Sequence, residues 1–169
     1  MRRLQAAFAA LALTLGAGGA CRAQGMGDWC RAVPLERSFC RALTVDVPKG
    51  TLRLAIATTG DERERGLMGV RSVPRGEGML FVFPDPADRM HDFWMKDTLV
   101  PLDMVFVRRD GTVSSIAARV PAMKPHARDA DIAHRAGLCR YVIELRSGGA
   151  AAAGITPGVR VAIPALAVS

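Results

Sequence analysis

Residues 78–83 read Gly-Met-Leu-Phe-Val-Phe, and the Pro-Asp-Pro of residues 84–86 closes this run. A short apolar run rich in strand-forming residues is typical of a strand that is buried on both faces. Such a strand lies inside a sheet, with a packed layer on each side of it. Residues 78–83 therefore predict a domain that is built around a sheet.

Other segments also have the patterns of strands, because they alternate apolar with polar residues or run apolar between turns. The turn residues 48–50, Pro-Lys-Gly, and 109–111, Arg-Asp-Gly, each separate two such segments, so we expect two hairpins. The further predicted strands are residues 43–47, 52–56, 91–98, 102–108, 112–120, 141–145 and 159–163.

Two short helices are expected between the strands. Residues 59–62, Thr-Gly-Asp-Glu, fit a capping box, in which the Thr hydroxyl and the Glu carboxylate each accept a hydrogen bond from a backbone N–H at the helix start. This motif predicts a helix over residues 61–68, which Gly69 can end. Ser147 can cap a second, Ala-rich helix over residues 148–153.

Residues 121–138 contain two prolines, His126, His134 and alternating charges, and we expect them to form a long surface loop. No repeat or linker divides the chain, and its 169 residues suit one domain. We therefore predict a single β-rich α+β domain over residues 42–165. About eight short strands would form a compact mixed or antiparallel sheet, or a small barrel, with two short helices.

The N-terminus has the layout of a secretory signal peptide, with two arginines, an apolar stretch and a small, Gly-rich exit. Cleavage after Ala23 would release a periplasmic or secreted protein, and we favour residues 1–23 as the signal peptide. Cleavage after Ala20 is the alternative, and it would leave Cys21 open to lipidation as a membrane anchor. No apolar run reaches the roughly 20 residues of a membrane-spanning helix, so we expect none in the mature protein.

The net charge suggests nucleic-acid binding only until the signal peptide is taken into account. The chain carries 23 Lys and Arg against 16 Asp and Glu, a formal charge of +7. Residues 1–23 hold three arginines and no acid, so their removal lowers the charge to +4. Export separates the protein from nucleic acid, and aromatic residues do not interleave with a basic stripe. We therefore expect no nucleic-acid partner.

The cysteines indicate a structural disulfide rather than a redox or zinc site, because no Cys-x-x-Cys pair occurs. Cys30 and Cys40 lie close together in a leader segment, residues 24–41, which has little other patterning. A disulfide between them would stabilise that segment. The alternatives pair Cys30 or Cys40 with Cys139, or leave Cys139 as a reactive thiol beside a base.

Five segments together have a recognisable order and spacing. They are residues 64–68 (ERGLM), 78–83 (GMLFVF), 93–103 (FWMKDTLVPLD), 140–145 (RYVIEL) and 154–158 (GITPG). In these segments the chain resembles the domain of unknown function 192 family, over roughly residues 43–163. The family usually has Asn at the position of Asp97 and often Arg at that of Val70. The resemblance implies a strand-rich fold and frequent export, and it brings no catalytic residues because the family has no established activity.

The block of residues 93–103 concentrates polar and aromatic side chains. A Trp94 ring beside the Lys96 ammonium can hold a planar or sugar-like ligand by stacking and a charge-assisted hydrogen bond. Alternatively, Trp94 packs in the core, Lys96 pairs with Asp103 or Glu144, and the block only fixes the register of the strands. The candidate ligand-binding residues are Arg65, Trp94, Lys96, Asp97, Asp103 and Glu144.

Two other functions compete with ligand binding. Asp103 and Glu144 stand in apolar strands, where desolvation raises the pKa of a carboxyl group, so a small hydrolase using either residue is the first alternative. A Met-rich copper-binding protein is the second, although most of the eight methionines lie in apolar strands, where Met simply fills a core. His126 and His134 with the aspartates between them can also face a cation.

The sequence thus favours an exported, non-catalytic binding or accessory module of the cell envelope. It would engage a small polar ligand or an envelope protein, and we predict neither a cofactor nor a bound metal. A deep polar cleft with a buried carboxylate at its floor would favour the hydrolase, whereas a shallow aromatic groove or a flat patch would favour the module.

Overall fold

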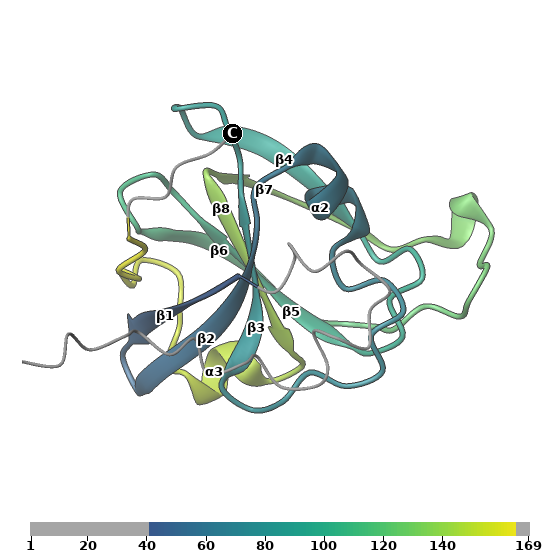
Figure 1. The fold of residues 1–169 in the computed structure, drawn as a ribbon, viewed down its shortest axis with the longest axis horizontal. Helices are drawn as coiled ribbons and strands as arrows, with labels where there is room; N and C mark the ends of the chain where they lie inside the picture. Colours follow the sequence, from purple (N-terminus) through teal and green to yellow (C-terminus); the bar gives the residue numbers. More distant parts are fainter. Residues whose placement is uncertain (1–40, 165–169) are drawn as a thin grey trace, which may run out of the picture.

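The computed structural model describes residues 41–164. They form a six-stranded sheet with the strand order β1-β2-β3-β8-β5-β6 and a two-stranded ribbon of β4 and β7 (Figure 1). The elements are β1 (Ala42–Val47), β2 (Gly50–Ala57), α2 (Gly60–Arg65), β3 (Glu77–Val82), β4 (Arg89–Trp94), β5 (Leu102–Val107), β6 (Val113–Val120), η2 (Asp129–Asp131), β7 (His134–Cys139), β8 (Tyr141–Arg146) and α3 (Gly149–Ala152). The predicted α+β class is confirmed, and the sheet is mixed and open rather than closed into a barrel.

Residues 78–82 form β3 together with Glu77, and every residue of the strand after Glu77 is buried. β3 runs parallel to β2 and antiparallel to β8, so it has a partner at each edge. Parallel strands need a crossover connection, and the chain supplies it through α2 and residues 66–76. The prediction of a strand buried on both faces is confirmed.

Each face of the sheet has its own apolar core. On one face, which we call the α2 face, the sheet packs against the turn after α2 and against the β4–β7 ribbon. The residues that cover this face include Leu67, Val70, Phe93, Met95 and Cys139. On the opposite face, the α3 face, the covering residues include Ala150, Ala153, Ile155 and Val161. Figure 1 shows α2 beside the ribbon and α3 at the other end of the sheet.

Helix α2 begins with the predicted capping box. The Thr59 Oγ1 accepts a hydrogen bond from the Glu62 backbone N–H, and the Glu62 carboxylate accepts one from the Thr59 backbone N–H. The helix ends at Gly66, which has a φ of 45°, instead of continuing to residue 68 as predicted. Because this left-handed conformation suits glycine, the chain leaves the helix there, before it reaches Gly69.

Strand β7 lies where the sequence predicts a loop over residues 121–138, and that prediction is wrong from residue 134 onward. Its sequence, HRAGLC, has no clear period, but it pairs with β4 along its full length. At Gly137 the ribbon comes so close to the sheet that an added Cβ would lie 2.3 Å from Cγ of Phe106. Pairing and close packing, rather than local propensity, make this segment a strand.

Two predictions near the C-terminal end are also wrong. Residues 159–163 form only a single bridge, between Thr112 and Arg160, because their backbone bonds go to the turn at residues 111–113 instead of to a full strand. Helix α3 starts after Gly148, whose φ of 80° places a glycine rather than Ser147 at the cap position. No helix within residues 41–164 is long and apolar enough to span a membrane.

Candidate functional site

Glu144 lies in the middle of β8 and points to the α2 face of the sheet. Ile143 and Leu145, on either side of it, point to the α3 face. Its direct cross-strand neighbours are Met79 on β3 and Met104 on β5, and both are almost completely buried. Only 4% of Glu144 is exposed. The sheet thus holds a carboxyl group between two apolar side chains.

Burial raises the pKa of Glu144 to about 8. The cause is desolvation, because the charged form loses its hydration and gains no partner in exchange. Within residues 41–164, the Glu144 carboxyl group forms no hydrogen bond or ion pair. At neutral pH the group is therefore mainly a neutral carboxylic acid, which can donate one hydrogen bond and accept others.

Trp94, the last residue of β4, forms part of a wall beside Glu144 together with Lys96. The Lys96 Nζ lies 5.2 Å from the centre of the Trp94 ring, a cation–π geometry. Trp94 is 37% exposed, so it is not a core residue. Among the described residues, Lys96 forms no ion pair. The alternative in which Lys96 pairs with Asp103 or Glu144 is therefore not the arrangement that the structure shows.

A narrow cleft connects these groups. Its space amounts to about 20 Å³, enough for about one water molecule. The residues that line it are Arg63, Glu64, Arg65, Gly66, Leu67, Met68, Phe81, Phe93, Trp94, Lys96, Thr98 and Glu144. We call it the Glu144 cleft. The structure thus brings together four of the six candidate binding residues, namely Arg65, Trp94, Lys96 and Glu144.

Asp103 lies elsewhere, because it points to the α3 face while Glu144 points to the α2 face. Its Oδ1 accepts a hydrogen bond from the Arg119 backbone N–H at 2.8 Å, and its Oδ2 accepts one from the Ala150 backbone N–H at 3.0 Å. Only 1% of Asp103 is exposed. Both of its oxygens are engaged in holding β6 and α3 to β5, so the residue has a structural role.

Asp97 also serves the backbone instead of lining the Glu144 cleft. It has a φ of 49°, and its Oδ1 accepts a hydrogen bond from the His126 backbone N–H at 3.0 Å. Its own carbonyl accepts a hydrogen bond from the Gly69 N–H at 2.9 Å. Asp97 therefore ties the turn after α2 to the loop around residue 126, next to the cleft.

Apart from Arg65, sequence reasoning missed the part of the cleft that α2 supplies. The Arg63 Nη1 donates hydrogen bonds to the carbonyls of Thr58 and Val82, and its guanidinium lies 5.4 Å from the centre of the Phe83 ring. These contacts hold α2 on the sheet, and Glu64 adds a second carboxylate to the cleft lining. The capping box predicts the helix, but no sequence signal predicts which strands it covers.

The methionines and histidines lie in surroundings that differ from those of a metal site. Met90 is 65% exposed on the ribbon, whereas three other methionines are in the core of the α2 face. Those three are Met79, Met95 and Met104. The His134 Nδ1 lies 2.6 Å from the Asp92 carboxylate. Within residues 41–164, no three His, Cys, Asp or Glu residues are grouped so that they could hold a metal ion.

Cys139 is a free, buried thiol. Burial, with a smaller contribution from Asp88, raises the pKa of Cys139 to about 12. A protonated thiol that is shielded from solvent is a poor nucleophile, so the structure does not support a reactive Cys139. Its pairing with Cys30 or Cys40 stays a prediction. Cys21, Cys30, Cys40 and the predicted signal peptide lie outside the described residues.

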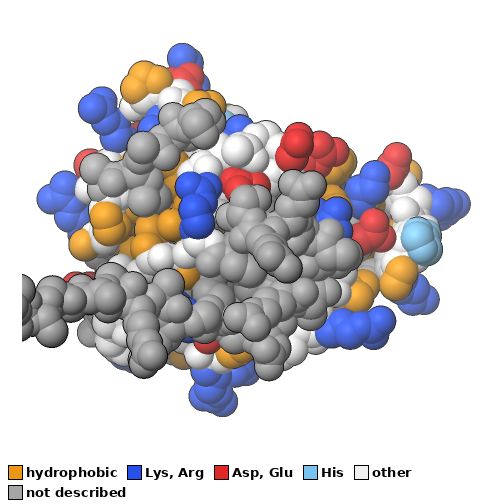
Figure 2. Space-filling view, viewed as in Figure 1, with side chains coloured by type: hydrophobic (Ala, Val, Ile, Leu, Met, Phe, Trp, Pro, Cys, Tyr) orange, Lys and Arg blue, Asp and Glu red, His pale blue; other side chains and the backbone are white. Residues whose placement is uncertain are grey.

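The charged side chains are mixed on the face that Figure 2 shows. Blue Lys and Arg side chains are spread around the outline, with red Asp and Glu side chains between them. The described residues on this face therefore do not form a continuous basic stripe of the kind that follows a nucleic-acid backbone.

A family model matches residues 43–163, which is most of the chain. The chain belongs to the DUF192 family. This family is described as uncharacterized ACR, so membership defines a fold and not an activity. The resemblance that the five sequence segments predict is confirmed.

Two crystal structures are similar to this DUF192 chain. One is a protein of unknown function from Novosphingobium aromaticivorans DSM 12444, which is 30% identical with a TM-score of 0.60, over 82% of this chain and 98% of that one. The other, from Sinorhizobium meliloti 1021, is described as a candidate transcription regulator. It is 32% identical with a TM-score of 0.57, over 70% of this chain and 89% of that one. Among curated proteins, none matches the chain.

Proposed function

We propose that this DUF192 protein is an exported binding module of the cell envelope that holds a small polar ligand in the Glu144 cleft. The observation that supports this function best is the Glu144 carboxyl group, which is buried without a hydrogen-bond partner in residues 41–164. A protonated carboxyl group can donate a hydrogen bond to a ligand that reaches it, and a typical bond of this kind contributes about 0.5–1.5 kcal/mol to the affinity.

The size and lining of the cleft define the chemistry of the ligand. The space beside Glu144, about 20 Å³, admits one small polar group such as a hydroxyl or a carboxylate oxygen. The rest of the ligand must then lie against the exposed part of the Trp94 ring, as sugars and planar molecules do. Lys96 adds a charged donor at the same place. A sugar or a planar molecule that carries a hydroxyl or carboxyl group has this chemistry.

The proposal places the ligand outside the cytoplasm, because residues 1–23 have the layout of a signal peptide. Cell fractionation with N-terminal mass analysis tests this step. We expect a periplasmic protein that begins after Ala23, or a lipidated one that begins at Cys21. An uncleaved cytoplasmic chain would contradict export. The transcription-regulator description belongs to the S. meliloti protein, and the mixed charges in Figure 2 give no reason to extend it to this chain.

Native mass spectrometry of protein purified from the periplasm tests binding. We expect a ligand adduct on the wild-type protein, and its loss in Trp94→Ala and in Glu144→Met, which removes both oxygens at similar volume. Leu138→Ala is the matched control, because Leu138 is 38% exposed on the same ribbon and does not line the cleft. A wild-type protein without an adduct, or equal adducts on all four proteins, would contradict the proposal.

A small hydrolase that uses Glu144 is the second candidate. The raised pKa keeps Glu144 protonated near pH 7, as a general acid requires. Glu64 is the other carboxylate in the cleft lining, whereas Asp103 lies on the opposite face of the sheet. A hydrolase would release a cleaved product instead of intact ligand. Glu64→Gln and Glu144→Gln would then each stop cleavage while binding persists.

A further inference from the structure

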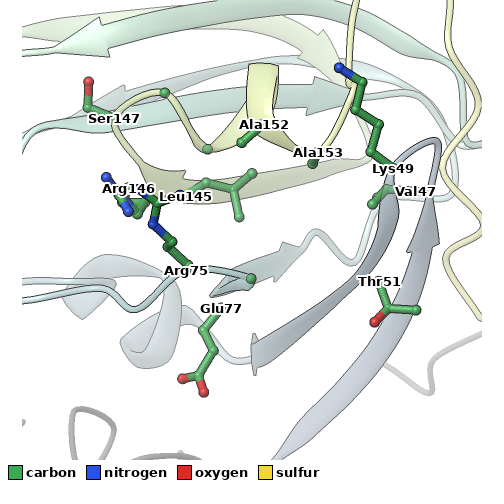
Figure 3. Close-up of a pocket in the computed structure, with 13 residues that line it drawn as sticks. Val47, Lys49, Thr51, Arg75, Glu77, Leu145, Arg146, Ser147, Ala152 and Ala153 are labelled. Carbon is green, nitrogen blue, oxygen red and sulfur yellow. The ribbon is translucent and has the colours of Figure 1, made fainter.

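A second hollow, of about 360 Å³, opens where the β1–β2 turn, the start of β3, the end of β8 and α3 meet (Figure 3). This volume suits a small organic molecule. No described residue lines both this hollow and the Glu144 cleft. Leu145 in its wall points to the α3 face, whereas Glu144 points to the α2 face. The two sites therefore open on opposite faces of the sheet and share no described lining residue.

Three cationic side chains from distant parts of the sequence line this hollow, which we call the basic hollow. They are Lys49 in the β1–β2 turn, Arg75 before β3 and Arg146 at the end of β8. None of the three side chains forms a hydrogen bond or an ion pair with another described residue. In Figure 3 Arg75 and Arg146 project to the same side of the hollow, and Lys49 stands across from them. Glu77 is the one carboxylate among the described lining residues.

The rest of the lining is mostly apolar or uncharged. Val47, Leu145 and two alanines of the α3 segment form an apolar wall between the arginines and Lys49 (Figure 3). Ser147 and Thr51 contribute the hydroxyl groups. A site that joins unpaired guanidinium groups to an apolar wall matches a molecule with an anionic group and an apolar body, because each part finds its complement.

We propose that the basic hollow binds a small organic anion. A carboxylate or phosphate group would lie between Arg75 and Arg146, since a guanidinium offers such groups paired N–H donors in a fixed geometry. The apolar part of the molecule would rest on Leu145 and the alanines. The bound charge would also relieve the mutual repulsion of the three cations, which no described carboxylate apart from Glu77 offsets within the hollow.

NMR titration of the isotope-labelled, exported protein tests this site with phenyl phosphate, benzoate and benzyl alcohol. We expect saturable shifts at Gly148 and Gly149, which line the hollow, with one or both anions and none with the neutral alcohol. The anion that binds more tightly identifies the head group, phosphate or carboxylate. Arg146→Gln and Arg75→Gln should each weaken binding about tenfold, the loss of one charge-assisted contact.

Arg71→Gln is the matched control, because Arg71 is exposed and lines neither site. Arg146→Gln changes a residue of β8 and can loosen the end of that strand. Arg75 is exposed on a connecting segment, so Arg75→Gln tests the same site without altering a strand. Equal weakening by Arg71→Gln, equal binding of benzyl alcohol, or no saturable shift at millimolar anion would overturn the proposal. Shifts confined to the Glu144 cleft would also overturn it while leaving the proposed function intact.

Discussion

Glu144 occupies a place on β8 where an aliphatic side chain would bury equally well between Met79 and Met104. Burial is tolerated because the carboxyl group can bind a proton and become neutral. This proton binding makes the free energy of unfolding depend on pH. The unfolded chain holds that proton only below a pKa of about 4.5, whereas the folded chain holds it up to about 8. The acid form is therefore the form that the fold stabilises.

The free energy of unfolding should fall as the pH rises through this window. Below pH 4.5 Glu144 is protonated in both the folded and the unfolded state, and its contribution to the free energy of unfolding is fully present. Between pH 4.5 and 8 only the folded state keeps the proton, so stability decreases by about 1.4 kcal/mol for each pH unit, and the contribution is lost above pH 8. Urea unfolding at several pH values should show this slope in the wild type and a smaller slope in Glu144→Gln.

Glu64→Gln is the control for that experiment, because Glu64 is exposed on α2 and the substitution is chemically identical. An unchanged slope in Glu144→Gln would show that other groups produce the pH dependence. Glu144 could be recognised from the sequence, since it is a carboxylate inside the otherwise apolar strand predicted over residues 141–145. That it shares a cleft with Trp94 could not be predicted, because this depends on where the ribbon crosses the sheet.

At the scale of elements, short segments here depend on bonds from distant residues. Helix α3 has four residues and no side-chain cap, too short to be stable alone. The Asp103 carboxylate on β5 supplies the missing acceptor for the Ala150 N–H. β7 likewise becomes a strand through β4, and its own sequence favours a loop. Local patterns therefore predict β1, β2, β3, β5, β6, β8 and residues 91–94 of β4. They fail for residues 95–98, which they place in that same strand, for β7 and for residues 159–163.

Asp103→Asn should loosen α3 and the end of β6 around Arg119 together. Asparagine keeps one acceptor oxygen, so one of the two N–H donors, from Arg119 or Ala150, faces an amide group. We expect a loss of about 1–3 kcal/mol in urea unfolding and faster hydrogen exchange at these two amides. Asp46→Asn, on the exposed edge strand β1, should change neither measurement. Normal exchange at Ala150 in Asp103→Asn would refute this role.

At the scale of the whole molecule, the sheet has an apolar core on each of its two faces. Cys139 lies inside the core of the α2 face. Its thiol can react only when the ribbon leaves the sheet, because burial shields the sulfur and raises the pKa of Cys139 to about 12. No sequence pattern predicts this placement. The order of strands in the sheet, with the parallel β2–β3 pair, is equally invisible in the sequence, since pairing partners are set by packing.

Labelling of Cys139 with a thiol reagent, followed by peptide mass mapping, should therefore report global unfolding. We expect labelling at least about a hundredfold slower in native protein than in denaturant, with a midpoint equal to that of the fluorescence transition. Mapping separates Cys139 from Cys30 and Cys40. Rapid labelling of Cys139 in native protein would mean that the ribbon opens on its own, which the packing of Gly137 on Phe106 argues against.

Strand β8 stands in the middle of the sheet, between β3 and β5, although it is the last of the described strands along the chain. Until residue 146 has left the ribosome, the β1–β2–β3 segment and the β5–β6 hairpin lack the strand that pairs with both of them. A nascent chain therefore cannot complete its sheet early, because long-range pairing must await the final segment. In the export that we propose, this late closure favours passage through a secretion channel before folding, because the sheet cannot be complete before β8 is available.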